Sequence, residues 1–213
     1  MVIDSSSQFV IQVAQEVVGQ SDSPSERLAL LFSFVRDRIT YSFSAASMLS
    51  SSNPAEVFRA SGTIKRGYGM CIQKAVLLCA LARASGFRAR LSFQALRDHR
   101  LPRELVALIG SDVLIPHGLV SVECGGRWLR LDASLDASLC VRKGYRLTVF
   151  SGVEDALLPT TDAQGRPHFE IIEELGDFDE FPLEFVVTTL AQRYAGADAE
   201  AVTNYVRRTG ATM

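Results

Sequence analysis

A cysteine at the start of an expected helix is the best candidate for a nucleophile. Cys71 opens the run Cys71–Ala84, whose residues favour a helix, and it follows a loop that carries Gly67 and Gly69. The thiolate is the reactive form of cysteine, and free backbone amides and the helix dipole favour that anion at a helix N-terminus. The glycines leave room for backbone to approach a substrate, and the Cys71 amide is available to stabilise an oxyanion. We therefore predict that Cys71 is the nucleophile of an acyl-transfer reaction.

A thiolate mechanism needs a base, and the chain has three histidines. His117 begins the alternating run 118–123, which is typical of a strand, so a rigid sheet could aim its ring at the start of the helix. His99 lies in a charged loop and His168 follows a turn. We expect surface positions for these two, from which either could still touch a substrate.

A carboxylate behind the histidine would fix its tautomer and support its charged form. Asp132 ends the predicted strand Arg127–Asp132, which returns from the turn pair Gly125-Gly126. It therefore lies near His117 if the hairpin pairs around that turn. Asp136 is the alternative acid, and either aspartate taken alone is more often a turn or cap residue. The prediction of an active site thus depends on the cysteine, the histidine and the aspartate together.

Substrate contacts are predicted around the start of the same helix. Gly69 leaves space for a substrate, and Tyr68 and Gln73 are candidates for the second donor to an oxyanion. Lys65 and Arg66, in the preceding loop, could assist through their charge.

The other cysteines are expected to pack in the interior as reduced thiols. Cys79 lies deep in the apolar helix and Cys124 in a strand, and Cys140 lacks surroundings like those of Cys71. Four cysteines in 213 residues lack the close pairing of a disulfide-stapled domain. No cysteines or histidines have the spacing of zinc ligands, so we expect no metal and no cofactor, and a structural metal site ranks last among the alternatives.

Two amphipathic helices are expected before the nucleophile, at Ser7–Val18 and Ser25–Ile39. A short aromatic stretch follows at Thr40–Phe43. Asn53 and Pro54 then predict a brief helix through Arg59, followed by a loop at 61–69.

The helix Cys71–Ala84 has few polar side chains, so it should be packed on most sides and lie at the centre of the domain. Beyond Gly86 the apolar pattern changes from period 3.6 to period two. The expected elements of this region are a strand at Phe87–Phe93, a short helix at Pro102–Ile109, and strands at Val113–Glu123 and Arg127–Asp132. After them we expect a candidate strand at Tyr145–Phe150, a turn region at 161–167, an apolar run at Phe169–Ile172 and a surface loop within Glu173–Glu180. Two helices, at Leu183–Tyr194 and Ala199–Arg208, are expected to form a hairpin around Gly196.

Length and composition fit a single domain, since 213 residues with 47% hydrophobic content can bury a substantial core. We expect a main domain at 1–180 and a C-terminal helical extension at 181–213 packed on it. The net charge of −2 and pI near 5.9 argue against nucleic-acid binding. Neither a basic, hydrophobic leader nor a run near the roughly 20 apolar residues of a membrane span is visible. We therefore expect a cytoplasmic protein without membrane contact, and the oligomeric state stays open.

Four segments together resemble the transglutaminase-like superfamily: Gly69–Leu78, Leu81–Arg90, His117–Glu123 and Gly126–Asp132. Single segments of this kind are common, but these blocks occur in the right order and carry the aromatic Trp128 before the acid. The resemblance implies a papain-like α+β fold, in which a helix carrying the cysteine packs on an antiparallel sheet and C-terminal helices follow.

The resemblance also implies roles for the three residues, with Cys71 as nucleophile, His117 as general base and Asp132 as orienting acid. The sequence departs from the family pattern beside the base, where Pro116 precedes it and Gly118 follows it. Such domains commonly have an aromatic residue close to this histidine, so the resemblance does not define the substrate groove in detail. The insertion from His99 to Ile115 could form an edge or lid of that groove.

The predicted function is a cysteine-dependent acyl enzyme acting on a peptide, a protein amide or a small amide. The thiolate attacks the carbonyl, and water or an amine resolves the thioester, with hydrolysis preferred over crosslinking. The alternative is a catalytically silent papain-like module that holds a peptide, because related folds include scaffolds without activity. The departure at Gly118 and the long C-terminal tail support that alternative.

Overall fold

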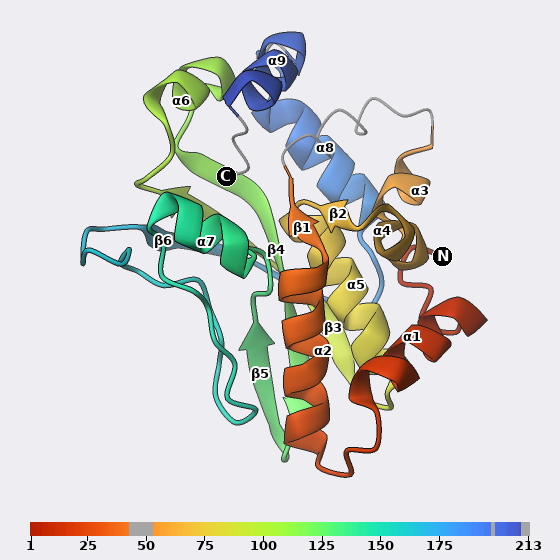
Figure 1. Cartoon of the computed structure of the whole chain (residues 1–213). Coiled ribbons are helices and arrows are strands. Elements are labelled where there is room, and N and C mark those ends of the chain that lie inside the picture. Colours follow the sequence, from red (N-terminus) through yellow and green to blue (C-terminus); the bar gives the residue numbers. More distant parts are fainter. Residues whose placement is uncertain (43–52, 197–198, 210–213) are drawn as a thin grey trace.

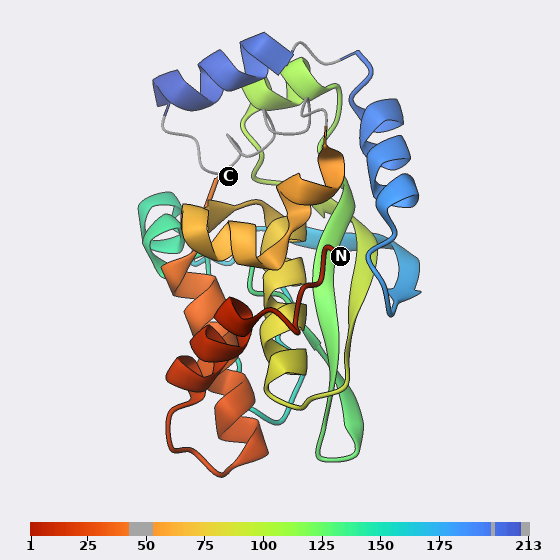
Figure 2. The same cartoon turned by 90° about the vertical axis from the view of Figure 1, so that its right-hand side faces the viewer.

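Helices, a four-stranded antiparallel sheet and a two-stranded parallel sheet make up the computed structural model, which describes residues 1–42, 53–196 and 199–209. Figure 1 shows the chain, and Figure 2 shows that α1, α2, α4 and α5 lie on one side of the sheet. The α+β class expected from the sequence is confirmed. The helices are α1 (Gln8–Val18), α2 (Pro24–Arg38), α3 (Pro54–Phe58), α4 (Ala60–Arg66), α5 (Cys71–Ala84), α6 (Arg103–Ile109), α7 (Ala137–Lys143), α8 (Leu183–Arg193) and α9 (Ala199–Thr209).

The strands form two sheets of unequal size. The larger has the order β5-β4-β3-β6, and the smaller is the parallel pair β1-β2. Their bounds are β1 (Thr40–Tyr41), β2 (Tyr68–Gly69), β3 (Ala89–Asp98), β4 (Val113–Cys124), β5 (Arg127–Leu131) and β6 (Phe169–Phe178).

The hairpin β4-β5 forms around the predicted turn. Gly125 and Gly126 have φ values of 60° and 76°, a left-handed conformation that a two-residue hairpin turn requires at both positions. Cys124 pairs with Arg127, and the ladder continues to Val120 opposite Leu131. The strand that carries His117 and the strand that leads to Asp132 therefore lie side by side, as the sequence predicted.

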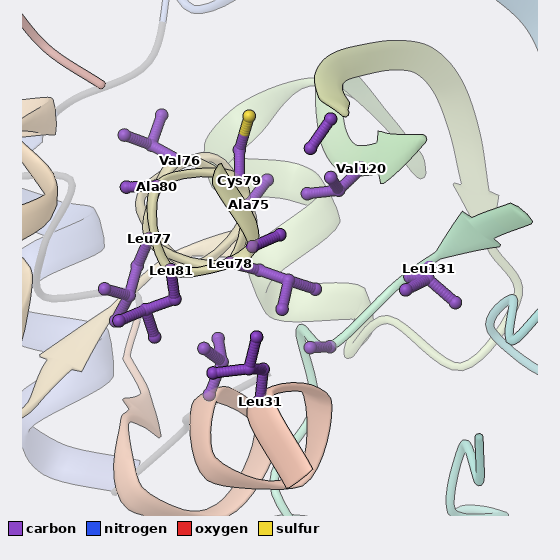
Figure 3. Close-up of a cluster of buried hydrophobic side chains, with 14 of the residues drawn as sticks. Leu31, Ala75, Val76, Leu77, Leu78, Cys79, Ala80, Leu81, Val120 and Leu131 are labelled. Carbon is purple, nitrogen blue, oxygen red and sulfur yellow. The ribbon is translucent and has the colours of Figure 1, made fainter. Parts of the chain in front are cut away.

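Helix α5 is the centre of the hydrophobic core. Every residue from Ile72 to Ala82 is buried. Figure 3 shows side chains projecting around its circumference, with Leu31 of α2, Val120 of β4 and Leu131 of β5 among the surrounding residues. Full burial of one such aliphatic side chain contributes about 1.5–3 kcal/mol. The prediction of a central helix is confirmed. Because the helix is packed around its circumference, the position of its N-terminus is fixed.

The loop expected at 61–69 is wrong, because residues 60–66 form helix α4. The glycines favoured a loop, but Gly62 lies inside the helix and only Gly67, at φ 74°, ends it. Buried Ala60 and Thr63 anchor the helix, so packing outweighs the low helix propensity of glycine.

The strand expected at Tyr145–Phe150 is also wrong, since the described chain there has no regular element. The guanidinium of Arg36 instead donates to the carbonyl of Thr148 at 2.8 Å, which ties the segment to α2.

The surface loop expected within Glu173–Glu180 is mostly strand β6. Its acidic side chains suggested a loop, but basic residues of β3 and β5 face them across the sheet. The ion pairs are Arg97–Glu170 at 3.2 Å, Arg130–Glu174 at 2.6 Å and Arg90–Asp177 at 2.9 Å.

The two C-terminal helices form close to their predicted positions. Helix α8 packs against β4 and α9 packs against α6, so they cover different parts of the domain (Figure 2). Phe43, at the end of the predicted aromatic stretch, lies outside the described residues. No helix in the described ranges is long and apolar enough to cross a membrane.

Candidate active site

Cys71 is the first residue of α5, and the elements before it fix its position. Strand β2 ends at Gly69 and pairs in parallel with β1, so that Tyr41 lies opposite Gly69. The backbone amide of Met70, the N-cap residue, donates to Oε1 of buried Gln73 at 2.8 Å. This bond caps the first turn of the helix. Cys71 remains partly exposed at the N-terminus of α5.

His117 and Asp132 form a buried ion pair on neighbouring strands. Nε2 of His117 donates to Oδ2 of Asp132 at 2.6 Å, and the two side chains are 3% and 0% exposed. The second carboxylate oxygen accepts the backbone amide of Ser134 at 3.0 Å. With both oxygens engaged, the carboxylate cannot turn away from the ring.

Burial and charge act on this pair in opposite directions. Burial disfavours the charged form of His117, but the Asp132 carboxylate and the Cys71 thiol outweigh it and raise the pKa of the imidazole to about 10. Burial likewise raises the pKa of Asp132, but the His117 charge and the bonds from His117 and Ser134 outweigh it and leave that pKa below its usual value. The pair is therefore imidazolium and carboxylate at neutral pH.

The other side of the ring faces Cys71. Nδ1 of His117 has no hydrogen-bond partner among the described residues, and Cys71 is a short-range neighbour that interacts with the ring. The order is thus sulfur, imidazole, carboxylate. The structure brings together the three residues that the sequence singled out.

Gly118 is required by the close approach of β4 to the start of α5. A Cβ atom at this position would lie 3.1 Å from Cα of Ile72 and 3.4 Å from the ring of Phe93. The glycine that departs from the family pattern therefore has a packing reason, since it lets the strand carry His117 close to Cys71.

The predicted substrate-binding residues lie around the same helix start. Tyr68 is 36% exposed, and Gly69 is buried where a Cβ would lie 3.0 Å from Cβ of Gln73. Gln73 uses Oε1 for the cap, while its Nε2 is buried without a partner among the described residues.

The other charged candidates have structural roles. Nζ of Lys65 lies over the ring of Phe9 at 5.5 Å, and Arg66 donates to the carbonyl of Val57 at 3.1 Å. Asp136, the alternative acid, caps α7 by accepting the amide of Leu139 at 2.8 Å. Its other oxygen accepts the amide of Tyr41 at 2.9 Å. Asp136 therefore holds β1 in place and does not replace Asp132.

Two tyrosines near Cys71 were not identified from the sequence. Tyr41 is buried, and its pKa is raised by burial and by the neighbouring Cys71. Tyr194, the C-cap of α8, has a pKa raised to about 12 by burial and then by Cys71. Tyr41 lies in the aromatic stretch that the sequence indicated, but Tyr194 had no local signal because it reaches the site from a distant helix.

A small cavity lies against His117. Its volume is about 10 Å³, enough for about one water, and its lining includes Tyr41, His117 and Ser134. A larger pocket of about 470 Å³ lies between β3, the start of β6 and the segment 157–167, and none of the three candidate catalytic residues lines it.

The surface position expected for His168 is wrong. The ring is fully buried between Tyr145 and Phe169, with centroids 4.2 and 3.8 Å away. Burial lowers its pKa to about 4. His99 is exposed, as expected, and bonds to Glu170 at 2.9 Å, so neither histidine belongs to the group of Cys71, His117 and Asp132.

The four cysteines are free thiols, as predicted. Burial raises the pKa of Cys79 to about 12 and that of Cys140 to about 11. Cys124 is partly exposed on β4.

A family model described as the Transglutaminase-like superfamily matches residues 11–133, more than half of the chain. The chain belongs to the transglutaminase-like superfamily. The matched segment contains Cys71, His117 and Asp132 and ends one residue after the acid. Membership supports a cysteine-based enzyme at the level of the family.

Three solved structures are similar to part of this chain. A candidate cysteine protease from Cytophaga hutchinsonii has a TM-score of 0.46 at 17% identity, covering 83% of this chain and 50% of that one. A candidate protease from Parabacteroides distasonis has a TM-score of 0.39 at 14% identity, covering 59% and 23%. A TGase has a TM-score of 0.40 at 14% identity, covering 61% and 31%. The chain thus spans half or less of these proteins, and its assignment rests on the family match. No curated protein matches it.

Proposed function

We propose that this chain is a cysteine-dependent acyl-transfer enzyme that cleaves an amide or peptide bond through a thioester, with Cys71, His117 and Asp132 as its catalytic residues. The observation that carries the proposal is the buried 2.6 Å pair of His117 and Asp132, whose imidazole turns its free nitrogen toward the cysteine at the mouth of α5. The substrates are peptides, protein amides or small amides, and the proposed setting is the cytoplasm.

The first half of the reaction transfers the acyl group to sulfur. The thiolate of Cys71 attacks the amide carbonyl, and the backbone amide of Cys71, a free donor at the helix N-terminus, stabilises the oxyanion. As the C–N bond breaks, the imidazolium of His117 gives its Nδ1 proton to the leaving amine. A thioester and a neutral imidazole result.

The second half releases the acyl group. His117 takes a proton from water as its oxygen attacks the thioester, and the carbon–sulfur bond then breaks to give a carboxylic acid and Cys71 thiolate beside imidazolium. An amine in place of water would give transamidation by the same steps. Hydrolysis is the preferred outcome because water needs no second binding site. Asp132 stays ionised throughout and holds the ring in place.

Selective alkylation tests this proposal. The protein is treated with iodoacetamide near neutral pH, and the labelled cysteine is identified by peptide mapping. Cys71 should react first and Cys71→Ala should abolish the fast phase, whereas Cys124→Ala, the matched control at another partly exposed thiol, should leave it unchanged. Fast labelling that bypasses Cys71 would overturn the proposal.

A silent peptide-binding module is the second candidate function. The packing around Gly118 removes one of its two supports, since this glycine is needed to seat β4 against α5. An unreactive Cys71 thiol, together with peptide binding that Cys71→Ala does not change, would favour this alternative.

A further inference from the structure

We propose that the larger pocket, between β3, the start of β6 and the segment 157–167, binds a large apolar residue of the amide or peptide substrate and receives a carbonyl oxygen of that residue on Gln94. This role rests on the proposed function, because the ligand is a residue of the proposed substrate. It adds a recognition site outside the group of Cys71, His117 and Asp132, none of which lines the pocket.

The pocket has the size and the lining of a site for an apolar ligand. Its volume is about 470 Å³, and small-molecule sites have volumes of roughly 300–1,000 Å³ with mostly apolar walls. Ile171 is 42% exposed, so the pocket opens to solvent beside this residue. A group that enters there leaves water for a wall of six apolar side chains: Leu96, Leu157, Leu158, Pro167, Phe169 and Ile171.

Gln94 is a polar group of the pocket with donor capacity to spare. Its side chain lines the pocket and is buried, at 2% exposure. Among the described residues it makes one hydrogen bond, a long one of 3.5 Å that Oε1 accepts from Arg130, and its amide nitrogen donates to no group. Glu170 at the rim, by contrast, is engaged by His99 at 2.9 Å and by Arg97 at 3.2 Å. Because a buried donor without an acceptor is costly, the pocket favours a ligand that brings a carbonyl oxygen to Gln94.

The pocket lies beside His117. Gln94 is the partner of His117 in the ladder of β3 and β4, and residues directly opposite in an antiparallel pair point to the same face with Cβ atoms about 4.5–5.5 Å apart. Leu96, Leu158 and Phe169 line both this pocket and the cavity of about 10 Å³ that His117 lines. A residue held in the pocket therefore lies next to the histidine and away from the sulfur. Binding at such a remote part of the substrate can orient the carbonyl that Cys71 attacks.

The first arm of the test measures binding alone. N-acetyl-phenylalaninamide is titrated into the full chain, and the methyl NMR signals of Leu157 and Leu158 should shift with one saturable midpoint. Ile171→Asp should weaken binding at least roughly tenfold, because one methylene in an apolar pocket already discriminates by about 10–200-fold. Ile172→Asp is the matched control, since Ile172 is 43% exposed on the same strand but does not line the pocket, and it should bind the probe as the wild type does.

Gln94→Met tests the polar contact. The variant keeps the length of the side chain but loses its amide. It should weaken the binding of N-acetyl-phenylalaninamide severalfold and leave the binding of ethylbenzene, which has no acceptor, near the wild-type value.

The second arm measures whether the pocket serves the substrate of Cys71. Chloromethyl ketones alkylate cysteine as the sulfur displaces chloride, and a series of peptide reagents places phenylalanine one, two or three residues from the reacting carbon, with glycine elsewhere. Second-order rates are assigned to Cys71 by peptide mapping and divided by the rate of the all-glycine reagent of the same length. At least one member should show a phenylalanine preference of roughly tenfold or more that Ile171→Asp removes and Ile172→Asp keeps.

The two arms separate the recognition site from the catalytic role of Cys71. A wild-type protein that does not bind the probe, or binding that Ile171→Asp leaves unchanged, would overturn the inference. A fast Cys71 thiol without any preference that depends on Ile171 would overturn it as well, since the pocket would then serve a separate ligand. The rate ratios are read even when the thiol is slow, so slow rates with a preference that depends on Ile171 would count against the proposed function only.

Discussion

Replacing Asp132 by asparagine removes the charge behind His117 while keeping the size of the side chain. In the intact protein the pKa of His117 is about 10, against an ordinary value of 6.5, although burial alone would lower it. The gap corresponds to roughly 5 kcal/mol at 1.36 kcal/mol per pKa unit. Without the carboxylate, burial becomes the dominant effect, and the pKa of His117 should fall toward or below 6.5. At pH 7 the ring would then be mostly neutral.

Two measurements follow the change. NMR titration of the His117 ring should move its midpoint from near pH 10 to 6.5 or below. The alkylation rate of Cys71 at pH 7 should fall, because a neutral ring no longer stabilises the neighbouring thiolate. Asp136→Asn is the matched control, because it removes a buried carboxylate that caps α7 without touching His117. A wild-type ring that titrates near 6.5, or an Asp132→Asn ring that still titrates near 10, would refute the reasoning.

Three further predictions concern the packing and charge around the site. Gly118→Ala places a methyl group against the backbone of Ile72. The change should lower the free energy of unfolding in urea by about 1–3 kcal/mol and slow the alkylation of Cys71. A variant with unchanged stability would contradict the packing argument. Lys74→Met leaves two backbone carbonyls at the end of α2 without their buried donor. The free energy of unfolding in urea should fall by about 1–3 kcal/mol. Equal stability of the variant and the wild type would show that the Lys74 ammonium contributes nothing. The raised pKa of His117 gives stability that is complete below pH 6.5 and is lost as the pH rises toward 10, whereas the lowered pKa of Asp132 gives stability that is present above pH 3.8 and is lost below it. The pair should therefore raise the melting temperature most between pH 3.8 and pH 6.5. A His117→Gln variant whose melting temperature has the same pH profile would exclude this linkage.

The sequence predicted the centre of the fold because the relevant patterns are local. Helix α5 has too few polar residues for a surface helix, and Gly125-Gly126 fixes the hairpin that sets two strands side by side. Those two features place the residues Cys71, His117 and Asp132 on elements that must meet.

The errors arose where tertiary contacts outweigh local composition. Acidic β6 is a strand because arginines of β3 and β5 lie opposite its carboxylates. Helix α4 accommodates Gly62 because its neighbours are buried, and His168 is buried because Tyr145 and Phe169 enclose its ring. Tyr194 lies within electrostatic range of Cys71 because α8 packs on β4, and no pattern within α8 signals that proximity.

The three candidate catalytic groups come from separate elements, in the order in which a ribosome would deliver them. The thiol emerges first on α5, the imidazole follows on β4, and the carboxylate comes after β5. A chain that ends before Asp132 lacks the carboxylate that binds the His117 ring at 2.6 Å in the folded protein. The buried pair of His117 and Asp132 can therefore form only once the hairpin β4-β5 is complete.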